Sequence, residues 1–373
     1  MFAYAYMQVM NILVVPVYTL ITASALSTLV SSYLYSLSLY GKLCSPPSLT
    51  NDASTATATP PKNMNILQWI QSHQVNKQWF THFYVFGLLN SAWIFWNIVS
   101  PGHSSGQNSL PFAELLLWML LLVHLSRRLY ECTYVHVWGT SKMNIAAYVI
   151  GMVYYVMLPF VFIPSTHPAL RMNCSTNGND SSTASCSASV NGFGFITDND
   201  TIRKLLIICG TALCIWSQYE QHLHHVILAK LRTSNSRPIP VTYRLPQGRW
   251  FQYVSSPHYL AEIMIYIGFI LLQSCARNEA AESTHTSQVP NVFSSFIIQQ
   301  ADTTSSLNWY LSPIIQLLIH CSSTPYKVCA LVSWIFVNLS ISARRTHLWY
   351  QHQFGKFPDN PVRHRKALIP FVW

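Results

Sequence analysis

The residues that could carry chemistry in this sequence gather in a few short stretches. The longest runs from Gln221 to Glu262 and is rich in histidine, arginine and tyrosine. A guanidinium group binds phosphate through two hydrogen bonds, so Arg232 and Arg244 suit a phosphorylated cofactor. Glu262 could hydrogen-bond a ribose or amide group, or favour the dipole of a helix N-terminus. The alternative is an ordinary positively charged loop that precedes a helix.

Three histidines in this stretch, His222, His224 and His225, suggest a metal site at first sight. No carboxylate or cysteine stands at ligand spacing from them, and the cysteines show no zinc-like spacing, so we predict no metal site. The sequence also has no GxGxxG after a strand, no Walker lysine and no GxSxG. A nucleotide would therefore bind to loops and helix ends.

Two apolar stretches carry polar side chains at one end. His82 and Tyr84 open one stretch as candidate proton donors, with an aromatic belt at the membrane interface as the alternative. The end of a second apolar stretch carries His124, Arg128 and Glu131. Their spacing of i, i+4 and i+7 places them on one helix face. That face is either a snorkelling interfacial ion pair or a contact for an anion or cofactor.

The C-terminal tail combines His352 with the basic run Arg363–Lys366 and ends in a short apolar stub. The stub is too short to cross a membrane. Taken alone, such a tail is typical of contact with anionic lipid head groups.

The elements that must position these residues follow from composition. Of the 373 residues, 50% are hydrophobic and only 9% are charged, whereas a soluble chain has about 25% charged residues. This excludes a soluble globular enzyme, a coiled coil and a disordered protein. The apolar runs are continuous rather than alternating, which argues against a β-barrel. We predict an all-α, polytopic membrane protein, whose net charge of +10 concerns its loops rather than nucleic acid.

Seven apolar stretches are close to the length of about twenty residues that spans a bilayer. A shorter run, Leu307–His320, competes for the last place. The expected spans lie within Tyr6–Tyr40 and at Phe80–Val99, Pro111–Tyr130, Ile145–Ile163, Leu205–Tyr219, Tyr259–Cys275 and Val328–Ala343.

The distribution of positive charge predicts the sidedness of these spans. The first basic residue, Lys42, follows the first apolar stretch, which is unlike a signal peptide and favours a lumenal N-terminus. With seven spans, most Lys and Arg residues then fall in cytosolic segments, and the C-terminus is cytosolic. Segment 45–62 is rich in Ser, Thr, Ala and Pro and is expected to be flexible.

The loop between the fourth and fifth spans carries three glycosylation sequons, and it lies on the lumenal side in this topology. We expect N-glycans at Asn173, Asn179 and Asn199. The same loop holds Cys174 and Cys186, which form either a disulfide in an oxidising lumen or two free thiols.

Several motifs resemble the steroid 5-alpha-reductase family, and within it the polyprenol reductase branch. The similarity covers most of 78–268 and then 343–373, with the motifs in the family's order. They are Lys77-Gln-Trp-Phe-Thr-His-Phe-Tyr84, Arg127-Arg-Leu-Tyr-Glu-Cys132, His225-Val-Ile-Leu-Ala-Lys-Leu-Arg232, Tyr243-Arg-Leu-Pro-Gln-Gly248, Tyr253-Val-Ser-Ser-Pro-His-Tyr-Leu-Ala-Glu262 and Arg365-Lys-Ala-Leu-Ile-Pro-Phe371.

The resemblance implies a seven-helix, NADPH-dependent reductase of the endoplasmic reticulum membrane. It divides the chain into N-terminal helices over 1–110 and a reductase core over 111–373. Within the core it places a cytosolic NADPH-binding loop at 225–262 and a tail at 344–373, and it suggests an insertion at 277–326. The cofactor contacts it implies are Arg232, Tyr243, Arg244, His258, Glu262, His352, Arg365 and Lys366.

The sequence departs from the steroid-reducing members of that family. Phe83 and Leu125 stand where those members hold the steroid ketone with Glu and Tyr. Ala261 stands where relatives often have Gly, and Gly355 where they have Tyr. The resemblance therefore favours another substrate, a polyprenyl lipid within the bilayer.

The reaction that this branch implies saturates the α-isoprene unit of a long-chain polyprenal or polyprenol, giving dolichal or dolichol for protein N-glycosylation. Hydride adds to an electron-poor carbon, so we expect the α,β-unsaturated aldehyde, polyprenal, to be the immediate substrate. A hydrogen-bond donor would polarise the aldehyde oxygen. The candidate catalytic residues are His82, Tyr84 and His124.

Three other functions stay open at this point. One is a steroid 3-oxo-5-alpha 4-dehydrogenase. Another is a membrane methyltransferase that uses S-adenosylmethionine, although the Pro257-His258-Tyr259 order differs from the His-Pro turn of those enzymes. The third is a seven-helix receptor, which leaves 243–262 and the tail unexplained.

Overall fold

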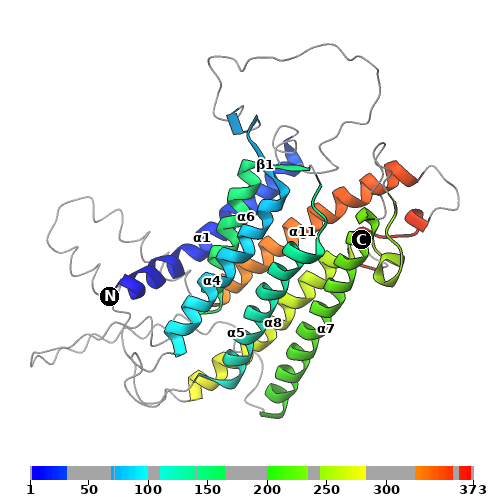
Figure 1. Ribbon diagram of the computed structural model, residues 1–373. Coiled ribbons are helices and arrows are strands. Elements are labelled where there is room, and N and C mark those ends of the chain that lie inside the picture. The colour runs from blue at the N-terminus through cyan, green and yellow to red at the C-terminus, as the bar shows by residue number, and fades with distance from the viewer. Residues whose placement is uncertain are drawn as a thin grey trace, which may run out of the picture.

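In the computed structural model the chain folds as a bundle of long helices (Figure 1). The structure describes residues 2–31, 69–70, 72–99, 110–139, 141–163, 200–233, 244–282, 324–355 and 361–370. The helices in this part are α1 (Phe2–Val30), α4 (Phe80–Val99), α5 (Phe112–Tyr130), α6 (Ile145–Val161), α7 (Asp200–Thr233), α8 (Pro257–Glu282) and α11 (Thr324–Phe354).

Within the described ranges, three helical segments are long and apolar enough to cross a membrane. They are Tyr6–Val30, Pro257–Cys275 and Thr324–Phe354, and Ile145–Val161 is a shorter apolar helix. The prediction of a helical membrane protein is confirmed in this form, whereas the count of seven spans and their sidedness stay predictions. The competing run Leu307–His320 lies outside the described residues.

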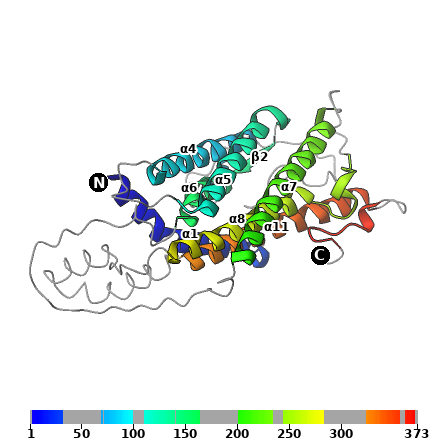
Figure 2. The ribbon, with the colours of Figure 1, turned by 90° about the horizontal axis from the view of Figure 1, so that it is seen from below.

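The spacing of apolar residues on α5 explains why this helix lies inside the bundle. Leu117, Leu121 and Leu125 follow one another at four-residue intervals and are fully buried. They belong to a core to which α1, α4, α6, α8 and α11 also contribute. Seen from below, α4, α5 and α6 form one side of the bundle, with α8 and α11 on the other (Figure 2).

Helices α7 and α8 cross with their backbones in close contact. A Cβ atom on Gly268 would lie 2.8 Å from the carbonyl oxygen of Gly210, so a larger residue at Gly268 would force the helices apart. The close approach continues toward the end of α7 and the start of α8. It brings Gln221 of α7 beside Glu262 of α8.

A short β-ribbon holds the starts of α4 and α6 together. Strand β1 (Gln74–Asn76) pairs antiparallel with β2 (Lys142–Asn144), and Val75 lies opposite Met143. Asn144 then caps α6, because its side-chain oxygen accepts a hydrogen bond of 2.8 Å from the amide of Ala146.

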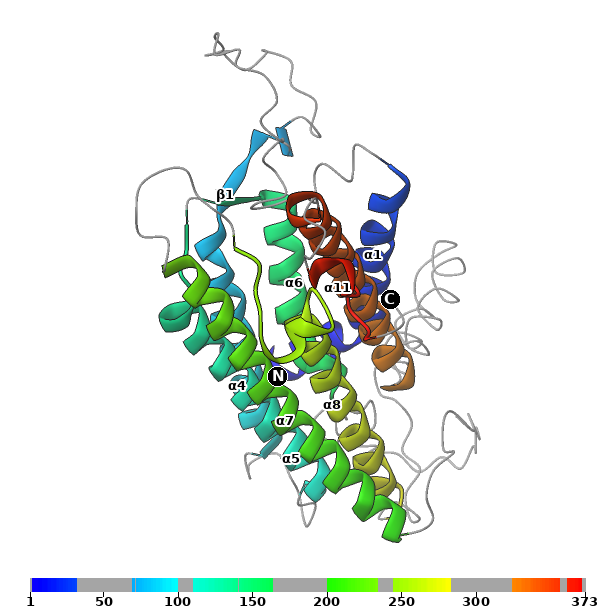
Figure 3. The same ribbon diagram turned by 90° about the vertical axis from the view of Figure 1, so that its right-hand side faces the viewer.

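The C-terminal tail returns to the segment that precedes α8. The amide of Ser255 donates to the carbonyl of Lys366 at 2.8 Å, and the amide of Lys366 donates to the carbonyl of Tyr253 at 2.9 Å. Figure 3 shows the tail beside this segment and the end of α11. The ends of α5, α7 and α11 and the start of α8 therefore lie at one end of the bundle (Figure 1).

The expected loop at 225–262 is largely helical. Helix α7 continues to Thr233 and α8 begins at Pro257, so in the described residues the non-helical part is confined to 244–256, with a 3-10 helix at Arg249–Gln252. The structure does not describe 45–62, most of 277–326, or the loop with Asn173, Cys174, Asn179, Cys186 and Asn199.

Candidate functional site

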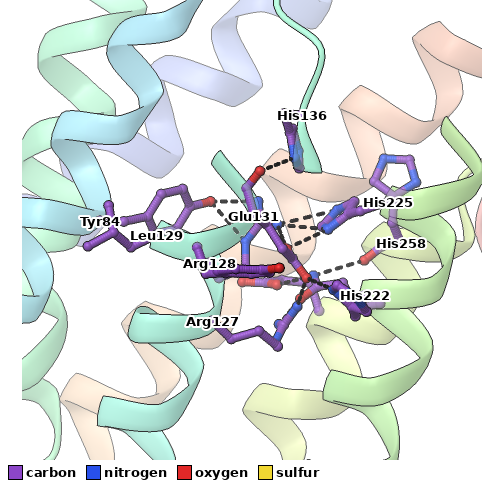
Figure 4. A network of polar contacts seen from close by, with 12 residues as sticks. Tyr84, Arg127, Arg128, Leu129, Glu131, His136, His222, His225 and His258 are labelled. Atoms are coloured by element: carbon purple, nitrogen blue, oxygen red, sulfur yellow. Dashed lines mark hydrogen bonds and ion pairs between the residues drawn. The ribbon is translucent and has the colours of Figure 1, made fainter. Parts of the chain in front are cut away.

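A buried glutamate marks the point where α5 ends. Glu131 opens a π-helical turn, Glu131–Val135, and its side chain is fully buried. Its carboxylate accepts hydrogen bonds from Arg127 and Arg128 of its own helix end. From α7, Nδ1 of His222 lies 2.9 Å and Nδ1 of His225 lies 2.7 Å from its oxygens. Figure 4 shows all four side chains around the carboxylate.

This arrangement keeps Glu131 ionised. Burial raises the pKa of the Glu131 carboxyl, but the bonded His225 ring and the guanidinium groups of Arg128 and Arg127 outweigh burial and hold that pKa well below its ordinary value. A buried carboxylate is tolerated only when it is paired and hydrogen-bonded in this way. The network therefore ties the end of α5 firmly to α7.

A chain of hydrogen bonds leads from this network to α8. Arg127 donates to the side-chain oxygen of Gln221, and the amide nitrogen of Gln221 donates to Glu262. The same nitrogen lies 3.3 Å from the carbonyl oxygen of His258. Gln221 therefore links Arg127, which is bonded to Glu131, to the carboxylate of Glu262, and both the oxygen and the nitrogen of its amide are hydrogen-bonded.

His124 approaches Glu262 from α5. The His124 side chain is fully buried, and its Nε2 lies 3.5 Å from Oε1 of Glu262. Its other ring nitrogen lies 3.4 Å from the guanidinium of Arg127. Side chains from α5 and α7 thus contact the carboxylate of Glu262 on α8.

The two other candidate donors lie on α4. The Tyr84 hydroxyl accepts hydrogen bonds of 3.1 and 2.7 Å from Arg128, so Tyr84 joins the network of Glu131. His82 is separate from it, because its Nδ1 lies 3.1 Å from the hydroxyl of Tyr148 on α6. The structure brings Tyr84 and His124 into one site and leaves His82 at its side.

A hollow of about 640 Å³ opens beside the same end of the bundle. It lies between the end of α7, the segment before α8 and the end of α11. Two of its lining residues, Lys230 and Arg244, are basic and favour an anionic ligand. The lining residues are Ile227, Lys230, Leu231, Arg244, Leu245, Gln247 and Phe354.

The turn that carries Arg244 into this hollow is held by an ion pair. The backbone of Arg249 has a φ of 48°, in the left-handed region that favours glycine, directly after Gly248 with a φ of 87°. Nε of Arg249 donates to Glu220 of α7 at 3.0 Å, and a second nitrogen donates to the other carboxylate oxygen. The bidentate pair compensates for the strained backbone.

Arg365 is the clearest sign of an anionic ligand. Its side chain is only 3% exposed, yet Nε and one terminal nitrogen have no hydrogen-bond partner among the described residues. A buried guanidinium with unsatisfied donors is costly. A phosphate group is a ligand that would satisfy it in two bonds, so the residues present fit a phosphorylated cofactor.

The remaining predicted cofactor residues that the structure describes lie around the same end. Arg232 is exposed and donates to the carbonyl of Val137 at 2.8 Å. The ring of His258 lies 5.7 Å from that of His225. His352 and Lys366 are exposed, and Tyr243 lies outside the described residues.

Sequence analysis missed the central role of Gln221. The available signal was the spacing of Gln218, Gln221 and His225, which puts three polar residues on one face of α7, where all three are buried. In the residues that the structure describes, no group of three or more His, Cys, Asp or Glu side chains could hold a metal ion.

The chain is similar in sequence to several known proteins. A family model described as 3-oxo-5-alpha-steroid 4-dehydrogenase matches residues 183–282 and 299–373. A polyprenal reductase of Danio rerio is 28% identical over 83% of this chain and 84% of its own length. Polyprenal reductase 1 of Arabidopsis thaliana is 26% identical over 81% and 83%, and the polyprenal reductase of Homo sapiens is 25% identical over 81% and 79%.

Proposed function

Because the chain belongs to the steroid 5-alpha-reductase family, we propose that it is an NADP-dependent oxidoreductase that acts on a CH–CH group and reduces polyprenal. The product, dolichal, leads to dolichol and supports protein N-glycosylation. The names of relatives from a fish, a plant and a mammal support this substrate class. The observation that carries the proposal is the buried Arg365, whose Nε and one terminal nitrogen have no hydrogen-bond partner among the described residues.

The cofactor proposed for this site is NADPH, which when bound supplies a hydride. Arg365 and Arg244 bind its phosphates, since Arg365 has buried donors without partners among the described residues and Arg244 lines the hollow. Glu262 and His258, at the start of α8, orient its ribose or amide groups. Arg232, Tyr243, His352 and Lys366 complete the proposed set of contacts.

The chain's own residues prepare the substrate for reduction. An isolated alkene resists hydride, whereas the alkene of an α,β-unsaturated aldehyde is electron-poor at its β-carbon. A donor that hydrogen-bonds the aldehyde oxygen increases this polarisation and stabilises the negative charge that develops there. The proposed donors are His82, Tyr84 and His124, and Nε2 of His124 lies 3.5 Å from the carboxylate of Glu262.

The apolar neighbours of these donors are consistent with a lipid substrate. Phe83 and Leu125 adjoin His82 and His124 in sequence, and both are buried. They offer no polar group to a steroid ketone. A polyprenyl chain stays in the bilayer while its aldehyde reaches the polar end of the bundle.

The membrane setting of this proposal comprises seven spans in the endoplasmic reticulum membrane. The N-terminus is lumenal, and the cofactor site faces the cytosol, where NADPH is available. The predicted N-glycans at Asn173, Asn179 and Asn199 fit a lumenal loop in this topology.

The experiment uses the full-length protein purified into lipid nanodiscs. Polyprenal, polyprenol and a 3-oxo-4-ene steroid are each supplied with NADPH, and products are identified by mass spectrometry. Polyprenal is expected to be consumed at least tenfold faster than either of the others. Reduction of polyprenol with polyprenal left untouched would contradict the proposal, and so would preferential reduction of the steroid.

A further inference from the structure

Two tyrosine hydroxyls meet in the interior of the bundle, away from the network of Glu131. The hydroxyl oxygens of Tyr154 on α6 and Tyr266 on α8 lie 2.5 Å apart, and both side chains are buried. Tyr18 of α1 supports the pair, because its hydroxyl donates to the carbonyl of Tyr154 at 3.2 Å. Three helices therefore fix the position of this pair.

The pair leaves one hydroxyl hydrogen unused. Each tyrosine brings one O–H donor, and the single hydrogen bond between them consumes only one. In the described part of the chain, neither hydroxyl has a further hydrogen-bond partner. A buried donor without an acceptor is costly in an apolar interior, so the arrangement suits an oxygen atom of a ligand.

The pair adjoins the proposed reaction site. Tyr266 follows Glu262 by one helical turn on α8, and its ring centroid lies 6.2 Å from that of His124. On the other side, the ring of Tyr154 lies 4.7 Å from that of Tyr155, which contacts Tyr84 at 4.8 Å. The unused hydroxyl hydrogen therefore belongs to the apolar side of the site, where the lipid substrate is expected.

We propose that Tyr266 donates a hydrogen bond to the aldehyde oxygen of the substrate, and that Tyr154 orients Tyr266 by donating to it. The inference rests on the proposed function and adds a donor beside His124. Oxyanion sites commonly combine two donors, and a donor that itself accepts a hydrogen bond is strengthened.

The reduction balances as follows. The hydride pair forms a C–H bond at the β-carbon, the alkene pair shifts to give an enolate, and NADPH is oxidised to NADP⁺ by two electrons. The enolate oxygen carries the negative charge, which the Tyr266 hydroxyl stabilises without transferring its proton. The α-carbon then takes a proton derived from water, which restores the aldehyde in saturated form.

The test compares Tyr266→Phe, Tyr154→Phe and Tyr18→Phe in nanodiscs. Loss of one oxyanion donor typically lowers kcat by about 10²-fold, and this is the result expected for Tyr266→Phe. The Kd for NADPH stays within about twofold of the intact protein's, because the proposed contact of the Tyr266 hydroxyl is with the substrate and not with the cofactor. Tyr154→Phe and Tyr18→Phe remove groups that hold Tyr266 in place, so each is expected to lose less activity than Tyr266→Phe.

An isotope effect separates a chemical role from a structural one. With NADPH deuterated at the transferred position, the isotope effect on kcat should rise in Tyr266→Phe, because the hydride step becomes slower relative to product release. If the substitution only lowers the fraction of folded protein, the rate and the number of NADPH-binding sites should fall in proportion and the isotope effect should stay unchanged. That result would overturn the inference. A Tyr266→Phe rate within threefold of the intact protein's would overturn it too. Failure of the intact protein to reduce polyprenal would instead overturn the proposed function.

Discussion

The Nε2 atom of His124 lies 3.5 Å from Oε1 of Glu262, and this contact joins α5 to the start of α8. Gln221 of α7 donates to the same carboxylate, so three helices converge on it. The Glu262 side chain is only 13% exposed, although it belongs to the first turns of its helix. Its carboxylate therefore serves the interior of the site rather than the surface of the protein.

Replacing Glu262 by Gln should weaken NADPH binding about tenfold or more, which corresponds to about 1.4 kcal/mol. The substitution keeps the size of the side chain but removes the charge that His124 and Gln221 face. The Kd for NADPH is measured by fluorescence titration of the protein in nanodiscs. Glu114→Gln is the control. Glu114 is also buried, but it lies in the first turn of α5, at the end of that helix away from His124. Equal weakening in both variants would argue against a specific role.

Removing the buried guanidinium of Arg365 should weaken NADPH binding without destabilising the cofactor-free protein. Arg365→Met deletes donors that lack partners among the described residues, so folding loses little. We expect the increase in melting temperature that NADPH causes to fall substantially. Arg363→Met is the matched control, because Arg363 is exposed and donates to the carbonyl of Gly355 at 3.0 Å. A melting shift that survives in Arg365→Met would contradict the assignment.

Breaking the ion pair between Glu220 and Arg249 should weaken NADPH binding and leave the rate of the chemical step unchanged. Glu220→Arg leaves two positive groups where a bidentate pair held the turn before α8. The KM for NADPH should rise about three- to tenfold, while kcat stays near that of the intact protein. The double variant Glu220→Arg, Arg249→Glu should recover part of the loss. No recovery would show that the charge pair does not position this turn.

Acidification should destabilise the protein through His136, a residue beyond the end of α5. Burial and the Arg128 guanidinium lower the pKa of His136 to about 4, while its ring bonds the carbonyl of Glu131. In the unfolded chain the ring has a pKa of about 6.5. Between these two values the unfolded state binds the proton, so stability falls as the pH drops from about 6.5 toward 4. His136→Gln should show a flatter dependence of melting temperature on pH, and an unchanged slope would refute this.

Sequence patterns were sufficient for the helices that carry long apolar runs. The expected spans Phe80–Val99, Pro111–Tyr130 and Ile145–Ile163 coincide with α4, α5 and α6 within a few residues, and Val328–Ala343 lies inside α11. Periodicity could not show that α7 extends to Thr233. Most of the residues that directly follow Tyr219 are polar, and Gln221 and His225 among them are buried against partners at the end of α5.

The candidate site was predictable only where residues are close in the sequence. The spacing of Arg128 and Glu131 predicts that they share one helix face, and the structure pairs them. The spacing gave no sign that histidines of α7 contact Glu131. The contact between Tyr154 and Tyr266 spans 112 residues and follows from tertiary packing alone. For the same reason, nothing in the local pattern distinguished His82 from His124.

The most direct measurement follows deuterium from the nicotinamide C4 of NADPH into the lipid product. The purified protein in nanodiscs is given polyprenal with NADPH deuterated at either face of C4, and the product is examined by mass spectrometry and NMR. One of the two cofactors should yield dolichal with a single deuterium on the β-carbon of the α-isoprene unit. Deuterium on the aldehyde carbon, or no transfer from either cofactor, would contradict the account.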